Sequence, residues 1–143
     1  MTGLEELQSM MRHERRVGIA ETIGFTLAEA SEDGVVLVST PGPHLFNPLG
    51  TIHGGYAATL LDSACGLALH ASLPGDKGYA TLEIKVSYLK GMTAGTGEVR
   101  CEGRVVSAGR RTAFTEAVLK DDSGKLLATA SSTLLIVDRP SAG

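Results

Sequence analysis

The spacing of apolar and polar residues changes along the chain, and each spacing predicts a different kind of element. Residues 4–16 combine good helix formers with apolar side chains at helical spacing, which predicts a short helix within an N-terminal helical segment of residues 1–20. Two β-type runs at residues 25–30 and 35–40 flank Glu32-Asp33-Gly34. Because an Asp-Gly pair tolerates positive φ, this segment predicts a β-hairpin.

The middle of the chain changes from a loop to a continuous apolar segment. Three prolines and two glycines between residues 41 and 50 disfavour regular structure there, since proline removes a donor and restricts its predecessor. Residues 54–72 are apolar around the whole circumference of a helix and rich in alanine and leucine. That pattern is typical of a buried helix rather than a surface helix.

The rest of the chain favours strands. Four β-type runs are separated by glycine-containing turns, at residues 79–89, 97–106, 112–119 and 126–137. A hairpin, one buried helix and four consecutive strands predict an α+β fold, with an antiparallel sheet wrapped around the helix. No linker or repeat divides the chain, so we expect a single domain over residues 1–143, with residues 138–143 as a tail.

Composition and charge exclude several classes of function. The net charge of −3 and the pI of about 5.8 give no basic footprint for nucleic acid. No apolar stretch reaches the roughly 18 to 20 residues that span a bilayer. Residues 1–16 lack a short apolar run followed by a cleavage site. We therefore expect a cytoplasmic protein with no nucleic-acid or membrane partner.

The sequence also argues against a metal or a bound cofactor. Cys65 and Cys101 lie inside apolar segments, without the spacing of a zinc site, and are interpreted as reduced core residues. The four histidines lack a ligand spacing, and the chain has no Walker sequence, dinucleotide fingerprint or Gly-x-Ser-x-Gly motif.

One segment carries candidate chemistry, namely His53-Gly54-Gly55 at the start of the apolar helix. The first N–H groups of a helix lack intrahelical partners and lie at the positive end of its dipole. The amides of Gly54 and Gly55 could therefore polarise a thioester carbonyl and stabilise an oxyanion. The alternative is that the two glycines only form the turn into the helix.

Asp62 is an acidic residue in the third turn of this apolar helix. Burying a carboxylate is costly, which suggests a group retained to attack a carbonyl or to take a proton from water. The alternative is a structural aspartate bonded to a nearby hydroxyl, such as that of Ser63, or to another chain.

Three further positions are candidates for orienting or binding a substrate. His53 could be a general base, although its place before the glycines favours a positioning role. Asn47 could hold the carbonyl oxygen or the attacking water, the alternative being an ordinary Asn turn. Arg110 and Arg111, adjacent at a turn with Gly109, could contact phosphates, although exposed arginine pairs are usually only solvated.

Helix geometry predicts that a site using both Gly54 and Asp62 needs two chains. Eight residues at about 1.5 Å each place them roughly 12 Å apart along one helix. Reacting atoms must come within about 3 to 3.5 Å. A two-fold dimer with antiparallel central helices would bring the start of one helix to the middle of its partner.

These features together resemble the hotdog-fold acyl-CoA thioesterases, in particular the phenylacetate-degradation (PaaI-like) type of the 4-hydroxybenzoyl-CoA thioesterase superfamily. The resemblance runs from about Gly24 to Val137. It rests on Asn47, His53-Gly54-Gly55 and Asp62 at the family's spacing, with Gly109-Arg110-Arg111 and the later Asp-Ser-Gly turn in support.

The resemblance implies a hotdog fold, a six-stranded antiparallel sheet around one central helix, in homodimers with shared active sites that often pair into homotetramers. It implies hydrolysis of acyl-CoA, with no cofactor other than the CoA of the substrate. Gly54 would polarise the carbonyl, Asn47 and His53 would help position it, and Asp62 would act as nucleophile or general base.

The resemblance also suggests which hydroxyl orients water and which residues meet CoA. Thr81 falls where relatives place that hydroxyl, and Ser63 and Ser87 are further candidates. Arg110 and Arg111 fall where relatives contact the CoA nucleotide. Alternative functions are a non-catalytic acyl-CoA binding or sensing domain and a hotdog enoyl-CoA hydratase or dehydratase. The nature of the acyl group cannot be derived from the residues.

Overall fold

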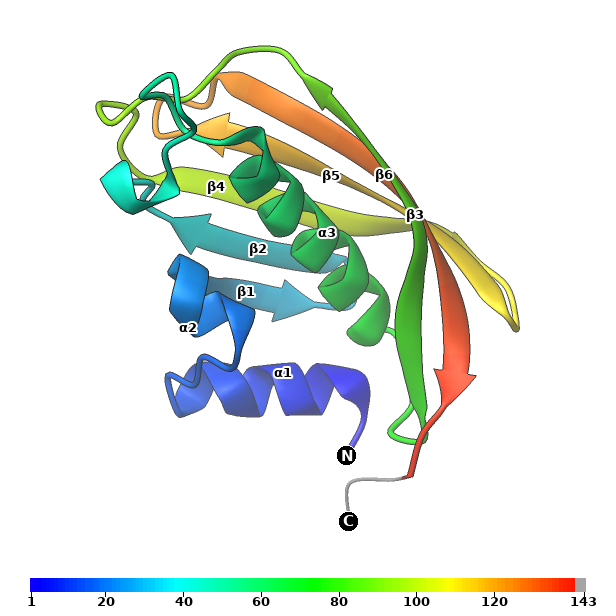
Figure 1. Cartoon of the computed structure of the whole chain (residues 1–143). Coiled ribbons are helices and arrows are strands. Elements are labelled where there is room, and N and C mark those ends of the chain that lie inside the picture. Colours follow the sequence, from blue (N-terminus) through cyan, green and yellow to red (C-terminus); the bar gives the residue numbers. More distant parts are fainter. Residues whose placement is uncertain (141–143) are drawn as a thin grey trace.

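A six-stranded antiparallel sheet curls around one long helix in the computed structural model, which describes residues 1–140 (Figure 1). The expected α+β fold and its central helix are therefore confirmed. The strands lie in the order β1-β2-β4-β5-β6-β3, and every neighbouring pair is antiparallel. The elements are α1 (Gly3–Arg12), α2 (Ile19–Ile23), β1 (Phe25–Ser31), β2 (Gly34–Ser39), η1 (Pro43–Leu45), α3 (Gly54–His70), β3 (Lys77–Tyr88), β4 (Val99–Ala108), β5 (Thr112–Asp121) and β6 (Leu126–Asp138).

The N-terminal segment forms two helices rather than one. Thr2 and Glu5 form a capping box that starts α1. The helix stops at Arg12, short of the predicted residue 16, and Glu14 adopts a positive φ of 49°. The second helix, α2, was not predicted, because five residues are too few to show a helical period. Gly18 and Gly24 flank it with φ of 58° and 91°.

The loop before α3 also departs from the prediction. Pro43 begins a short 3₁₀ helix, η1, where no regular structure was expected. Proline has no N–H to lose in the first turn of a helix, so this position tolerates it. The remaining differences in element boundaries are small, and the tail begins at Arg139 because β6 extends to Asp138. Residues 141–143 of the expected tail lie outside the described part of the chain.

The central helix α3 packs against strands β2 to β6 along its length (Figure 1). Leu60, Leu61 and Leu69 are fully buried, and burying each such side chain stabilises the fold by about 1.5–3 kcal/mol. At Gly103 of β4 an added Cβ would lie 2.3 Å from the Ala64 carbonyl oxygen, so glycine allows the sheet to touch the helix backbone.

The two cysteines lie in this core as free thiols, as predicted. Cys65 is on α3 and Cys101 on β4. Burial raises the pKa of both thiols, which keeps them protonated and poorly nucleophilic. Their role is therefore in packing.

The two edges of the sheet differ. Helices α1 and α2 both contact the edge strand β1, whereas β3 pairs only with β6 and is largely exposed. Leu82 and Tyr88 of β3 are each 57% exposed. A β-bulge at Leu82, between the pairs of Thr81 and Glu83, interrupts the register of β3 with β6.

The start of α1 docks on the end of α3. Gly3 N donates to Leu73 O at 2.9 Å, and a Cβ at Gly3 would lie 1.9 Å from His70 O. Glu6 accepts hydrogen bonds from His70 Nε2 at 3.3 Å and from Arg139. No helix within residues 1–140 has the length and apolar character needed to cross a bilayer.

Candidate active site

The start of α3 is fixed by His53, its N-cap residue. The His53 backbone is extended, and its Nδ1 accepts a hydrogen bond from Gly55 N at 2.8 Å. His53 N in turn donates to Leu45 O at 2.8 Å, which ties the cap to η1. Because Nδ1 is an acceptor here, the neutral ring carries its proton on Nε2 and can donate outward.

This cap distinguishes the two glycines that follow. The Gly55 N–H is occupied by His53, so in this structure Gly55 does not offer the free amide that was expected of it. Within residues 1–140, no group accepts a hydrogen bond from Gly54 N–H. A free N–H at the positive end of a 17-residue helix is a donor for a partly negative oxygen.

Tyr88 supports the same turn and was not singled out in the sequence. Its hydroxyl donates to Gly54 O at 2.6 Å, and a Cβ at Gly54 would lie 3.2 Å from that hydroxyl. The edge strand β3 thereby holds the backbone of Gly54 from the carbonyl side. The 34 residues that separate the two partners hide this contact from any local pattern.

Asn47 stabilises its own loop. Its Oδ1 accepts from Leu49 N at 2.9 Å and from Thr51 N at 3.2 Å, and its Nδ2 donates to Thr51 Oγ1 at 2.9 Å. These contacts form an Asn turn, which was the alternative to a substrate-binding role for this residue. Its contact with a substrate carbonyl stays a prediction.

Asp62 and Thr81 form a pair in the middle of α3. Asp62 is half-buried, and Thr81 Oγ1 donates to its Oδ1 at 2.9 Å. Of the three candidate hydroxyls, that of Thr81 bonds the carboxylate. Ser87 lies further along β3, where it pairs with Thr129. A carboxylate with one oxygen held and the other free can act on a carbonyl or on a water molecule.

The chain does not bring Gly54 and Asp62 together. They lie at opposite ends of an eight-residue span of α3, roughly 12 Å at the rise of an α-helix. The two β3 residues that support them, Tyr88 and Thr81, are correspondingly separated along the strand. The described chain therefore contains two candidate half-sites, one with a free amide and one with a carboxylate.

Arg110 and Arg111 occupy the turn between β4 and β5. Gly109 N donates to Thr112 O at 2.9 Å to close this turn, and Ile136 N donates to Arg111 O at 2.7 Å. Ile136 pairs with Tyr79, at the end of β3 remote from Tyr88. Both arginines are exposed and lie at the Thr81 end of the sheet rather than near Gly54 of the same chain (Figure 1).

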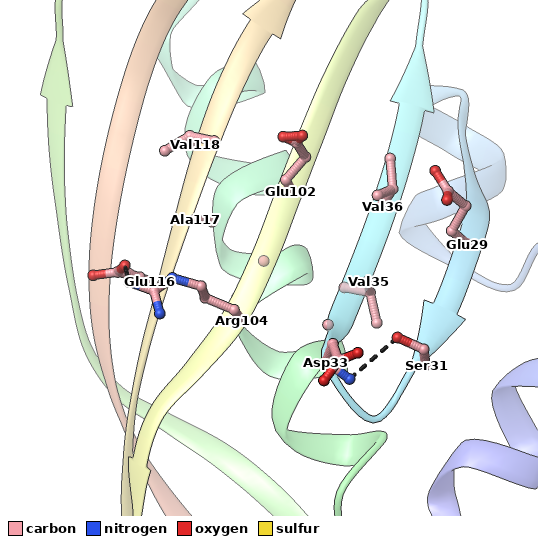
Figure 2. Close-up of a pocket in the computed structure, with 12 residues that line it drawn as sticks. Glu29, Ser31, Asp33, Val35, Val36, Glu102, Arg104, Glu116, Ala117 and Val118 are labelled. Carbon is pink, nitrogen blue, oxygen red and sulfur yellow. Dashed lines mark hydrogen bonds and ion pairs between the residues drawn. The ribbon is translucent and has the colours of Figure 1, made fainter.

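A hollow of about 400 Å³ lies elsewhere, on the outer face of the sheet (Figure 2). Charged side chains of β1, β4 and β5 line it, among them Arg104 and Glu116, which form an ion pair with each other. The sheet separates this hollow from α3, so it is remote from both half-sites. Within residues 1–140, no group of three or more histidine, cysteine or acidic side chains is arranged to hold a metal ion.

Comparison with known proteins identifies relatives over most of the chain. Residues 49–128 match the family model described as Thioesterase superfamily. The 1,4-dihydroxy-2-naphthoyl-CoA hydrolase of Listeria monocytogenes is 25% identical over 120 residues, which is 84% of this chain and 96% of that protein. The human acyl-coenzyme A thioesterase 13 is 28% identical over 110 residues, covering 76% of this chain and 77% of that protein.

One solved structure is also similar to this chain. The phenylacetic acid degradation-related protein of Ralstonia eutropha JMP134 superposes with a TM-score of 0.80 at 26% identity. The superposition covers 90% of this chain and 98% of that one. The family match over residues 49–128 includes the start of α3, Asp62 and Thr81.

Proposed function

This chain belongs to the thioesterase superfamily, and we propose that it hydrolyses acyl-CoA thioesters to a free acid and CoA. The observation that carries the proposal is the free Gly54 amide at the start of the same helix that holds Asp62. Two relatives named above act on CoA thioesters, as their names state, which supports CoA as the thiol of the substrate.

In the proposed reaction, the Gly54 N–H binds the thioester carbonyl oxygen and stabilises the negative charge that develops on it. His53 precedes this amide, and because its Nδ1 is used by Gly55 N, its Nε2–H is available to position the acyl-CoA. Asp62 either removes a proton from water, which adds to the carbonyl carbon, or adds to that carbon itself. In both routes the carbon–sulfur bond breaks, CoA leaves as the thiolate, and water supplies the oxygen and the protons of the products.

Thr81 orients the carboxylate in this scheme, because its hydroxyl bonds Oδ1 and leaves Oδ2 to act. Arg110 and Arg111 bind phosphates of CoA from the Thr81 end of the sheet. The amide and the carboxylate supply the polarisation, so we expect no metal or cofactor, and dialysis against EDTA should leave turnover unchanged.

Each site is proposed to combine two chains in a homodimer. The separation of Gly54 from Asp62 prevents one chain from placing both groups on one carbonyl. The exposed edge strand β3, which supports both half-sites, is suited to pair with the same strand of a second copy. We expect such dimers to associate further into homotetramers.

The test is the release of CoA from a panel of acyl-CoA thioesters, with the hydration of an enoyl-CoA measured in parallel. Release of free CoA in multiple turnovers is expected. Binding without CoA release would instead favour an acyl-CoA sensing domain. Hydration without release would favour a hydratase.

A further inference from the structure

A cavity of about 250 Å³ lies between α3, the inner side of β1 and β2, and the N-terminal segment, and it belongs to neither candidate half-site described above. One wall is α3, which contributes Ser63, the neighbour of Asp62, and Leu67 one turn later. The N-terminal segment covers it with Met10 of α1 and with Val17, Ile19 and Ala20. The cavity therefore reaches α3 at the residue that follows Asp62 and continues toward α1 and α2.

Tyr79 of β3 also lines this cavity. Its ring lies directly over Gly66, where an added Cβ would be 2.5 Å from the nearest ring carbon and 2.8 Å from the hydroxyl oxygen. A second contact, edge to face, joins the ring to His70 at a centroid distance of 6.0 Å. The ring is therefore packed in place. Burial and the negative charge of Asp62 raise the pKa of Tyr79, consistent with a neutral ring close to the carboxylate.

The lining is suited to an apolar ligand. Most of the side chains that face the cavity are apolar, and the charged ones, Arg15 and Arg16, are exposed. Val17 and Ile19 are large apolar residues that remain 53% and 56% exposed beside the cavity. Exposed apolar side chains around an apolar hollow are typical of a binding site for an apolar group.

We infer that this cavity receives the acyl group of the substrate, and that Tyr79 limits the size of the acyl group that is hydrolysed. The inference rests on the proposed function. An acyl group bonded to the carbon that Asp62 acts on must extend from the neighbourhood of Asp62. This apolar cavity borders that neighbourhood through Ser63, the next residue of α3, and through Tyr79, whose ring is close enough to respond to the charge of Asp62. A cavity of about 150 Å³ holds benzene, so 250 Å³ has room for roughly ten carbon atoms. The substrate class is therefore acyl groups of short to medium length or of one ring.

The test compares kcat/KM over straight-chain substrates from acetyl-CoA to palmitoyl-CoA. The wild-type protein is expected to be most efficient near octanoyl-CoA and to decline beyond decanoyl-CoA. Tyr79→Ala removes the ring and should raise the ratio of efficiency on myristoyl-CoA to that on octanoyl-CoA by about tenfold, in the range seen when a pocket gains room for methylenes. Ala20→Leu narrows the cavity from the N-terminal side and should shift the profile the opposite way, even if Tyr79→Ala fails to fold.

Two variants serve as controls. Tyr79→Phe keeps the ring and should keep the wild-type profile, because size is the property at issue. Phe114→Ala makes the same kind of truncation on β5, at a residue that is 51% exposed and does not line the cavity, and it should also leave the profile unchanged. A profile that does not respond to Ala20→Leu or to a folded Tyr79→Ala variant, or that responds equally to Phe114→Ala, overturns the assignment.

A second readout separates this inference from the proposed function. Isothermal titration calorimetry with free acids from butyrate to myristate measures occupancy of the cavity without any hydrolysis. Medium-chain acids should bind the wild-type protein best, and Ala20→Leu should weaken them. If no thioester is cleaved but this dependence appears, the hydrolase proposal fails and the cavity assignment stands. If thioesters are cleaved and neither readout depends on the cavity variants, only the cavity assignment fails.

Discussion

The two ends of α3 are held by opposite kinds of contact. At its start, the helix is joined to a loop by His53 and leaves the Gly54 N–H without a partner in the described chain. At its end, His70 bonds Glu6 of α1, and Gly3 packs directly on the His70 carbonyl. The candidate reactive groups of α3 thus lie at its start and middle, and the contacts that anchor it to the N-terminal segment lie at its end. Changes near its start and middle should affect turnover, and changes at its end should affect stability.

The strongest test of this separation is Asp62→Asn, which keeps the shape of the side chain and removes its basic oxygen. We expect kcat to fall by at least about 10²-fold, with acyl-CoA affinity and thermal unfolding little changed. Steady-state turnover and calorimetric binding measure the two effects. A variant that retains more than about a tenth of wild-type turnover would show that Asp62 is not the catalytic carboxylate.

The next largest effect is expected from mixing two damaged chains. Asn47→Ala damages the loop at the start of α3, and Asp62→Asn damages its middle, so each chain alone should be nearly inactive. If sites are shared, every mixed dimer has one intact site. Random pairing makes about half of the dimers mixed, so activity should recover to roughly a quarter of wild type. Tagged pull-down confirms subunit exchange, and activity that stays at the level of the single variants would place each site within one chain.

Thr81→Val should have a smaller effect on the same half-site. The change keeps the volume and removes the hydroxyl that donates to Asp62 Oδ1, and a lost hydrogen bond to a charged group corresponds to about a tenfold fall in kcat. Ser87→Ala, on the same strand but without a contact to Asp62, is the matched control and should leave kcat near wild type. Equal losses in the two variants would contradict the role given to Thr81.

The smallest effect is expected at the other end of α3, and on stability alone. Burial would raise the pKa of Glu6, but the hydrogen bond and charge of Arg139, with His70, outweigh it, so the pKa of Glu6 is lowered in the fold. Its ionised form therefore stabilises the protein above the pKa of an unfolded glutamate, and this contribution is lost as the pH falls through the lower folded value.

Glu6→Gln should accordingly reduce the free energy of unfolding by about 0.5–1 kcal/mol at neutral pH. The difference from wild type should shrink below about pH 4. Urea denaturation at the two pH values measures it. Turnover should stay at the wild-type level, and a large loss of kcat in a folded Glu6→Gln protein would break the separation between the two ends.

Elements with a clear period or composition could be predicted from the sequence, and those made by a single turn could not. The strands and α3 follow from runs of 6 to 17 residues, whereas α2 has five residues and η1 three. The position of α2 depends on its flanking glycines and on packing against β1, and the position of η1 depends on Pro43. Gly54 and Asp62 stand out because a turn and a carboxylate are unusual in an apolar segment.

The contacts around the candidate site could not be predicted from the sequence. The bond from Tyr88 to Gly54 depends on the register of an edge strand against a helix, which no spacing along the chain encodes. The use of the Gly55 amide by His53 depends on the rotamer of one side chain. The sequence can therefore propose candidate groups for the site, while the hydrogen-bond partners of those groups become known only from the fold.

The bulge at Leu82 has a consequence for how β3 serves both halves of the site. Residues on a strand alternate between faces, so Thr81 and Tyr88, seven positions apart, would face opposite sides of a regular strand. The extra residue restores their phase, and both side chains reach α3. The extra residue Leu82 thus determines which face of β3 the side chains on either side of it occupy. Deleting it would turn one of the two supports away from the helix while removing none of the groups that they hold.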